Sequence, residues 1–208
     1  RFNIHEVPWV EQAFNTKKYA FAADYIRLYA LYHHGGIYLD SDVEILKSLD
    51  NFLELPYFVG AETSGTIEAA ILGAEKGCDW IKCCLDYYEG RNFIREDGSY
   101  DIRMLPEILN ETILRLKPVI NMPSGSNIDD LKKKDLGEAV YVLPKEYFSP
   151  KVFDSREVFL TPETHAIHHY QNSWFSHKAF AYYRTRTLFI KIFGYKAVRS
   201  LEKMLLKR

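Results

Sequence analysis

The feature that most constrains this chain is a pair of glycines between a long apolar segment and two aspartates. The stretch reads Gly35-Gly36-Ile37-Tyr38-Leu39-Asp40-Ser41-Asp42. Glycine readily adopts the left-handed backbone that ends a helix. The apolar triplet after it is typical of a short buried strand, and the two carboxylates follow directly. The sequence therefore predicts a helix, a tight turn, and a buried strand that ends in two acidic side chains.

The segment before the glycines predicts one long helix over residues 11–34. Its apolar side chains recur with a broad helical period and few polar interruptions. Asp24 and Arg27 are three residues apart, so they share one face of that helix. Burying charges there is costly unless they are paired or used. Two interpretations stay open: a structural ion pair, and a charged pair that holds a ligand.

Farther along, predicted helices alternate with short apolar strands, which indicates an α/β layered fold. We expect strands at 37–39, 57–59, 69–72 and 140–143, with 43–46 as an extended continuation of the first. We expect helices at 79–88, 106–116 and 185–207, the last interrupted at Gly194. Residues 122–130 are rich in proline, glycine and serine, so they predict a loop, and residues 163–177 show no clear period.

Composition excludes several classes of protein. The chain has 208 residues, 47% hydrophobic and 26% charged, which fits one globular domain. Its 27 basic and 28 acidic residues give a net charge of −1, which argues against binding nucleic acid through phosphate contacts. The three cysteines include an adjacent pair and match neither a disulfide framework nor a zinc site, so we expect a reducing, cytoplasmic compartment. No apolar run approaches the ~18 residues of a membrane span.

The carboxy-terminal segment has the opposite charge from the rest of the chain. Residues 184–208 hold eight basic residues and one acid, a net +7, whereas the remainder holds 19 basic and 27 acidic residues, a net −8. Apolar and basic residues alternate through this segment, which predicts a basic amphipathic helix. Such a helix can lie on an anionic membrane surface. It can equally dock on the acidic body of the protein, and the sequence favours neither.

Asp40 and Asp42 suggest a metal site. They follow a buried strand, where ligand sites form in α/β sheets. Carboxylate oxygens suit hard divalent cations such as Mn²⁺ or Mg²⁺. A cation held there could bridge the two phosphates of a nucleotide and neutralise charge on the leaving group. The alternative is a turn with two solvated aspartates.

A histidine cluster near the carboxy terminus offers further ligands. His165, His168 and His169 precede Asn172-Ser173-Trp174. Histidine is a ready metal ligand, and tryptophan offers a flat apolar lid. The alternative is that these histidines only pack or form hydrogen bonds.

Taken together, these residues resemble a known family. The stretch from Tyr19 to Asp42 resembles the sugar-binding region containing the Asp-x-Asp motif of glycosyltransferase family 32, and the catalytic core of the large clostridial glucosylating toxins. Ile167-His168-His169 with Ser173-Trp174 resembles that family's carboxy-terminal His…Ser-Trp element. The resemblance implies a GT-A-like catalytic domain over residues 1–180, with a Rossmann-type mixed sheet flanked by helices, and a separate basic helix over 181–208.

The resemblance also implies an activity: metal-dependent hexosyl transfer, with retention of configuration, from a nucleotide sugar to a glycan or lipid-linked acceptor. UDP is the favoured nucleotide and GDP the alternative. Many family members build bacterial capsular polysaccharides or exopolysaccharides, so we expect that role at the inner face of the membrane. Family members usually begin with a strand that holds the base, and we expect that strand upstream of Arg1.

The implied roles fall on individual residues. The donor sugar is held by Asp24 and Arg27, the nucleotide lies near Tyr38, and the ribose and sugar contact Asp40. The metal binds Asp42, with His169 favoured by its spacing to the tryptophan and with assistance from Asn172. The diphosphate is covered by Ser173 and Trp174.

Two rival interpretations come from other classes. Asp40-Ser41-Asp42-Val43 also resembles the first motif of haloacid-dehalogenase-like phosphatases, with Asp129-Asp130 as a late acidic pair. That motif normally lies on the first strand, and this interpretation leaves the His…Ser-Trp element without a role. The other rival is a non-catalytic sugar-nucleotide-binding or scaffold protein, and its only support is that nothing before Trp9 supplies the base-binding strand.

Overall fold

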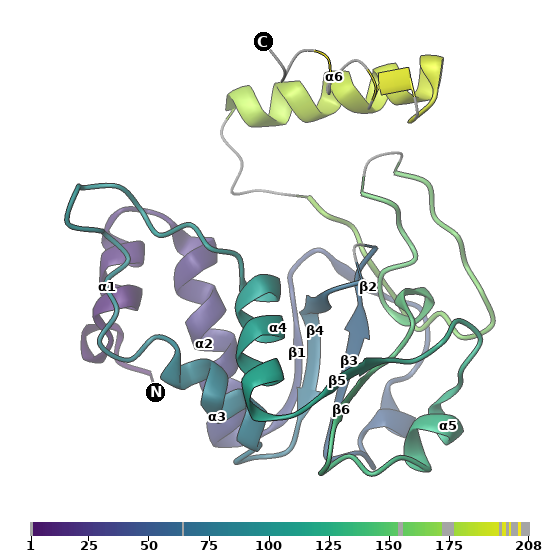
Figure 1. Cartoon of the computed structure of the whole chain (residues 1–208), viewed down its shortest axis with the longest axis horizontal. Coiled ribbons are helices and arrows are strands. Elements are labelled where there is room, and N and C mark those ends of the chain that lie inside the picture. Colours follow the sequence, from purple (N-terminus) through teal and green to yellow (C-terminus); the bar gives the residue numbers. More distant parts are fainter. Residues whose placement is uncertain are drawn as a thin grey trace.

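The computed structural model describes residues 2–63, 65–153, 156–171 and 177–195, together with 197, 198, 200 and 204. Its helices are η1 (Ile4–Glu6), α1 (Pro8–Asn15), α2 (Tyr19–His34), η2 (Asp50–Phe52), α3 (Asp79–Asp86), α4 (Leu105–Leu116), α5 (Ile128–Lys132), η3 (Lys145–Tyr147) and α6 (His177–Phe193). Its strands are β1 (Gly36–Leu39), β2 (Val43–Ile45), β3 (Tyr57–Ala61), β4 (Ile67–Ala74), β5 (Val119–Asn121), β6 (Val140–Val142) and β7 (Ala166–His168). The predicted α/β class is confirmed (Figure 1).

The central sheet has three antiparallel strands in the order β1-β4-β3. Every residue of β3 and β4 is buried, which explains their nearly continuous apolar sequences. Small residues on β4 leave room for large neighbours. A Cβ added at Gly73 would lie 2.0 Å from the ring of Phe58 on β3, so only glycine fits at this crossing.

Two shorter pairs extend this framework and make the strand arrangement mixed. β5 and β6 are parallel, and a parallel bridge between Gly60 and Leu143 connects β3 to the end of β6. β2 and β7 are antiparallel, with Val43 opposite His168. The β2–β7 pairing carries His168, far away in the sequence, to the turn that follows β1.

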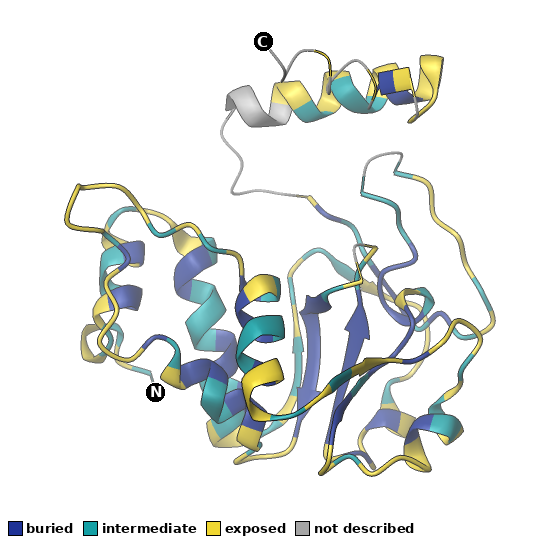
Figure 2. Ribbon diagram, in the orientation of Figure 1, coloured by how far each residue is buried: buried dark blue, intermediate teal, exposed yellow. Residues whose placement is uncertain are grey.

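Two apolar cores lie on the two faces of the central sheet. Helices α1 to α4 gather on one side, where their buried side chains form the larger core with β3 and β4 (Figure 1). The smaller core lies on the other side and includes residues of η2, η3, α5 and β7. The buried centre of the sheet is visible in Figure 2, where β3 and β4 are dark blue. Among the described residues, no helix has both the length and the apolarity needed to cross a membrane.

The prediction of one helix over residues 11–34 is wrong. The chain forms α1 and α2 with a break between them, because Lys17 has a left-handed backbone with φ of 60°. The Thr16 hydroxyl donates to the carbonyl oxygens of Gln12 and Ala13 and so closes the first helix. The predicted end of the second helix is confirmed: Gly35 has φ of 69° and donates its N–H to the carbonyl of Leu31.

Three further boundaries differ from the prediction. The expected loop at 122–130 contains the start of α5, which Asn127 and Asp130 cap reciprocally. The segment 163–177 contains β7, whose three residues are too few to show a period. Helix α6 begins at His177 and not at residue 185, and it ends at Phe193 before Gly194, as predicted for the break. Most residues after 200 lie outside the described part of the chain.

Candidate functional site

The turn between β1 and β2 fixes the two aspartates. Asp40 continues the sheet ladder by donating its backbone N–H to the carbonyl of Ala70, 2.9 Å away. Val43 then donates to the carbonyl of Asp40 at 3.1 Å, which closes the turn and starts β2. The side chain of Asp42 accepts from the backbone N–H of Gln171 at 2.8 Å. Asp40 and Asp42 therefore lie where the central sheet meets the β2–β7 pair.

Strand β7 brings one histidine to the aspartates. The backbone N–H of His169 donates to the carbonyl of Asp42 at 3.0 Å, next to the pairing of β7 with β2. The His168 ring then lies with its Nε2 atom 3.6 Å from Oδ1 of Asp42. Ligand atoms of Asp40, Asp42 and His168 all lie within 4.8 Å of one another.

Arg27 connects α2 to this cluster. Its side chain is 7% exposed and pairs with Asp24 at 3.1 Å and with Asp40 at 3.3 Å. It also donates to the carbonyl of Ala69 on β4 at 2.8 Å, and its guanidinium lies 4.6 Å from the ring centre of Tyr38. The predicted pair on one helix face is thus present, and it extends to the first aspartate of the motif. Within the described residues the Nε atom of Arg27 is buried and has no hydrogen-bond partner.

Two neighbours adjust the charges around Arg27. The Tyr38 hydroxyl donates to Oδ1 of Asp40 at 2.5 Å, and burial raises the pKa of Tyr38, so the hydroxyl stays protonated. Asp24 is 14% exposed. Burial raises the pKa of Asp24 to about 7; Arg27 opposes this rise and the charge of Asp40 adds to it.

The other predicted ligands lie elsewhere. His169 faces away from the aspartates: its Nε2 contacts Glu44 at 2.8 Å and its Nδ1 contacts Lys151 at 3.3 Å. Successive side chains leave a strand on opposite faces, so β7 can send only one of the two adjacent histidines to the cluster. The structure places His168 there instead of His169. The ring of His165 stacks on Tyr147 and has a packing role. Asn172, Ser173 and Trp174 lie outside the described residues.

One residue of the site was not predicted. Glu68 on β4 is hydrogen-bonded to Nδ1 of His168 at 3.0 Å and is 3% exposed. The expected strand began at residue 69 and left it out. The sequence did contain a sign of this residue, because Glu68 is the single acidic residue in the otherwise apolar run Ile67-Glu68-Ala69-Ala70-Ile71.

The donor set fits a hard divalent cation. Two carboxylates and one imidazole can bind Mn²⁺ or Mg²⁺, which prefer oxygen ligands and tolerate nitrogen. The 3.6 Å between Asp42 and His168 is a separation that two ligands of one ion can span, at about 2.1 Å each. Asp42 and His168 are the best-placed ligands, because Arg27 and Tyr38 already engage Asp40.

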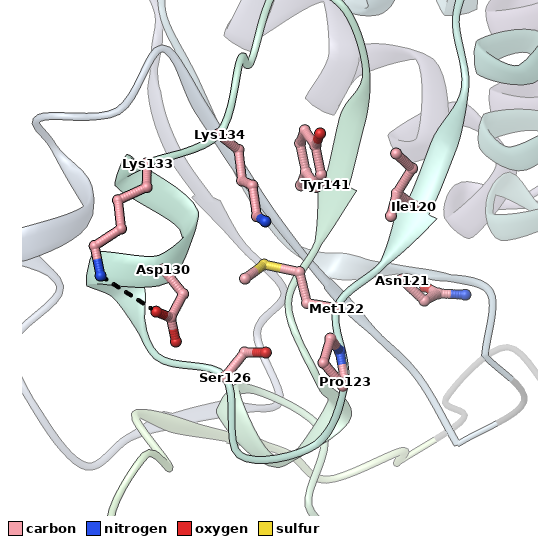
Figure 3. Close-up of a pocket in the computed structure, with 9 residues that line it drawn as sticks. All are labelled: Ile120, Asn121, Met122, Pro123, Ser126, Asp130, Lys133, Lys134 and Tyr141. Carbon is pink, nitrogen blue, oxygen red and sulfur yellow. Dashed lines mark hydrogen bonds and ion pairs between the residues drawn. The ribbon is translucent and has the colours of Figure 1, made fainter.

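A pocket of ≈ 260 Å³ lies away from this cluster, between α5 and the β5–β6 pair (Figure 3). None of the clustered residues Asp24, Arg27, Asp40, Asp42 and His168 lines it. Its lining is mostly apolar, with Lys133 and Asp130 paired at its margin. We assign it no part in the site.

The family match agrees with this geometry. A family model described as the glycosyltransferase sugar-binding region containing DXD motif matches residues 1–59. That range includes Asp24, Arg27, Tyr38, Asp40 and Asp42. The resemblance found in the sequence is therefore confirmed for residues 1–59, which match this family's model.

Similar proteins are known from fungi. The chain is 34% identical over 77 residues to inositol phosphoceramide mannosyltransferase 3 of Schizosaccharomyces pombe, covering 36% of this chain and 22% of that protein. It is 38% identical over 65 residues to glucan organizing enzyme 1 of Cryptococcus neoformans, covering 31% and 18%. It is 33% identical over 74 residues to mannosyl phosphorylinositol ceramide synthase CSH1 of Saccharomyces cerevisiae, covering 35% and 20%. The chain thus aligns with about a fifth of each relative's length.

A solved structure, the PaToxG glycosyltransferase, is also similar. It shares 22% sequence identity and a TM-score of 0.39, over 51% of this chain and 38% of that chain. At that score the structural likeness is weak, so the assignment rests on the sequence matches.

The raised pKa of Asp24 predicts a pH-dependent stability. The folded chain keeps a proton on Asp24 up to about pH 7, whereas the unfolded chain releases it near pH 4. The free energy of unfolding should therefore fall as the pH rises through this window. Asp24→Asn removes this contribution. Between about pH 4.5 and 7.5 the free energy of unfolding of the wild type should fall by up to about 3 kcal/mol relative to that of the variant. Urea denaturation measures both.

The matched control is Asp129→Asn, which changes an exposed aspartate on α5. It should follow the wild type at both pH values. A difference between wild type and Asp24→Asn that does not change with pH would contradict the raised pKa of Asp24.

Proposed function

We propose that this chain is the catalytic core of a metal-dependent glycosyltransferase that moves a hexose from a nucleotide sugar to a glycan or lipid-linked acceptor. One observation carries the proposal. The cluster of Asp40, Asp42 and His168, joined to the buried Arg27, is built around the motif of a matched sugar-binding region. A metal site beside a buried cation suits a reaction whose leaving group is a diphosphate.

The donor sugar is assigned to Asp24 and Arg27. The Asp24 carboxylate can accept hydrogen bonds from sugar hydroxyls, and the guanidinium of Arg27 supplies donors and a positive charge beside it. Asp40 is placed between this pair and the turn, where it can contact both ribose and sugar. Tyr38 orients Asp40 through its 2.5 Å hydrogen bond and borders the nucleotide.

The diphosphate is assigned to the turn between β1 and β2. Asp42 and His168 would hold the cation there. A bound Mn²⁺ or Mg²⁺ would neutralise charge on the leaving diphosphate. Arg27 adds a fixed positive charge close to Asp40, within a region that is largely shielded from water. Asn172, Ser173 and Trp174, outside the described residues, keep their predicted place over the diphosphate as part of this proposal.

The finer identity of the reaction follows from the resemblance and the relatives' names. UDP is the favoured nucleotide and GDP the alternative, with retention of configuration. Two of the relatives are named for mannosyl transfer involving inositol phosphoceramide, which supports a lipid-linked acceptor. The three relatives described above are fungal, so they lend no support to the bacterial capsular role expected from the sequence.

We include peripheral contact with an anionic membrane in the proposal. Four large apolar side chains on α6, Leu188, Phe189, Ile192 and Phe193, are between 49% and 62% exposed. Positions i, i+1, i+4 and i+5 share one helix face. The exposed Arg184 and Lys191 lie on the same helix. An apolar face with basic residues on the helix is suited to an anionic lipid surface. All three cysteines are free, in keeping with a cytoplasmic location.

The rival interpretations find less support. In the phosphatase interpretation Asp129 and Asp130 form a late acidic pair. Asp130 instead caps α5 by accepting from the backbone N–H of Asn127 at 3.1 Å, and it pairs with Lys133. A non-catalytic role would not require the clustered metal ligands.

Asp42→Asn tests the catalytic proposal. Loss of one metal-binding carboxylate should lower sugar transfer or donor hydrolysis about 100- to 1000-fold in the presence of Mn²⁺, the range seen when a group that stabilises transition-state charge is removed. Asparagine keeps the shape of Asp42 and an oxygen that can accept from Gln171, so the free energy of unfolding should change by no more than about 1 kcal/mol.

Release of sugar from UDP- and GDP-hexoses measures this effect, with Asp129→Asn as the matched control of unchanged activity. Normal turnover by Asp42→Asn would show that the assigned metal role is wrong. Phosphate release from an aryl phosphate by the wild type would favour the phosphatase.

Flotation with lipid vesicles tests the membrane proposal. The wild type should float with phosphatidylserine-containing vesicles and much less with neutral ones. Replacing Phe189 and Ile192 by serine should reduce the floated fraction by about tenfold, because large apolar groups no longer enter the interface. The control replaces Leu114 and Leu116, which are exposed on α4, by serine. Equal flotation of both double variants would rule out α6 as the contact.

A further inference from the structure

Glu68 is a buried carboxylate that the proposed donor and metal roles do not use. It is 3% exposed, and four donors surround it. They are the backbone N–H of Ala70 at 2.9 Å, the Ser149 hydroxyl at 2.6 Å, Nδ1 of His168 at 3.0 Å and the Tyr170 hydroxyl at 3.4 Å. The backbone N–H of Ala70 can only donate, and the other three groups converge on the same carboxyl group, so Glu68 is the acceptor of this cluster.

This arrangement fixes which nitrogen of His168 carries the proton. A carboxylate that three other donors already surround serves as an acceptor in the fourth contact too, so the hydrogen in the 3.0 Å contact belongs to Nδ1 of His168. The neutral ring then presents a lone pair at Nε2. That atom lies 3.6 Å from Oδ1 of Asp42. The lone pair of Nε2 and the carboxylate oxygen of Asp42 repel each other at this distance. A cation between them would be bound by both atoms.

The strand that carries Glu68 also holds the aspartate turn. The carbonyl of Ala70, two residues along β4, accepts the backbone N–H of Asp40. One short stretch of β4 therefore sets the position of the motif and of the group that orients the histidine. Tyr170 lies shortly after β7 and has a left-handed backbone with φ of 52°. Its hydroxyl donates a hydrogen bond to Glu68. The Glu68 carboxylate is thus contacted from β4, from β7 and from Tyr170 shortly after β7.

We propose that Glu68 is a positioning residue that fixes the tautomer and orientation of His168, so that its Nε2 atom completes a divalent-cation site with Asp40 and Asp42. This inference rests on the proposed function for the place of that cation. A carboxylate behind a ligating imidazole fixes the ring and raises its basicity, and its loss typically costs 10- to 100-fold in metal affinity. Glu68 touches neither donor nor metal, and acts through His168 alone.

Direct Mn²⁺ binding, without any nucleotide sugar, tests the inference. Electron paramagnetic resonance of free Mn²⁺ in titrations of the chain gives the affinity. Glu68→Gln should weaken Mn²⁺ binding by roughly 10- to 100-fold. The matched control is Ser149→Ala, which removes another donor to the same carboxylate and leaves the His168 contact. It should weaken binding by less than about threefold, although both variants remove a buried hydrogen bond.

A double-mutant cycle separates positioning from general loss of structure. In a His168→Ala background, Glu68→Gln should add less than about threefold to the loss of Mn²⁺ affinity, because its route through the imidazole is already gone. An equal loss in both backgrounds would overturn the proposal. So would a folded Glu68→Gln chain that binds Mn²⁺ as the wild type does.

Nitrogen-15 NMR of histidine-labelled, metal-free chain gives a readout that does not depend on metal. At a pH where the ring is neutral, His168 should show Nδ1–H in the wild type and a changed tautomer balance in Glu68→Gln. The Nε2–H tautomer in the wild type would overturn the assignment, even if the variant failed to fold. If the wild type binds no Mn²⁺, the proposed metal site fails, and the tautomer still decides the role of Glu68.

Discussion

The buried guanidinium of Arg27 is the interaction on which the site depends. It joins three parts of the fold: Asp24 on its own helix, Asp40 at the end of β1, and the carbonyl of Ala69 on β4. A buried charge without partners would cost several kcal/mol, so the helix and the two strands hold one relative position. The aspartate turn takes its place because this ion pair network fixes the strand end that leads into it.

The positive and negative charges around Arg27 do not cancel. The excess negative charge suits the proposed cation. Asp40 and Asp42 both lie in the turn that follows β1. The guanidinium of Arg27 already pairs with Asp24 and Asp40. Asp42 keeps an oxygen that faces His168. Burial raises the pKa of Asp24 to about 7, so at neutral pH a proton, and not a counterion, neutralises part of the charge of Asp24. A divalent cation at Asp42 and His168 would complete the charge balance.

Local features of the fold were predictable from the sequence, because they depend on neighbouring residues. The glycine pair ends α2, and the apolar triplet forms β1 and leads into Asp40, as expected. The prediction that this strand is buried is wrong, because β1 lies at the edge of the sheet and its residues are half-buried or exposed. The break at Lys17 was missed because the apolar period continues across it.

Features that depend on strand pairing were not predictable. The choice between His168 and His169 is set by the register of β7 on β2, and a three-residue strand carries no periodic signal. Glu68 contacts His168 across 100 residues of sequence, so only the folded chain reveals their partnership.

The central claim is that the site binds a nucleotide sugar together with a divalent cation. A thermal-shift screen of UDP- and GDP-hexoses, each with and without Mn²⁺, tests it most directly. A ligand that binds only the folded chain stabilises it by about 2.7 kcal/mol at a hundred times its dissociation constant. The account predicts a rise in Tm with one nucleotide that requires Mn²⁺ and is lost in Asp42→Asn. No rise with either nucleotide, with or without Mn²⁺, would contradict it.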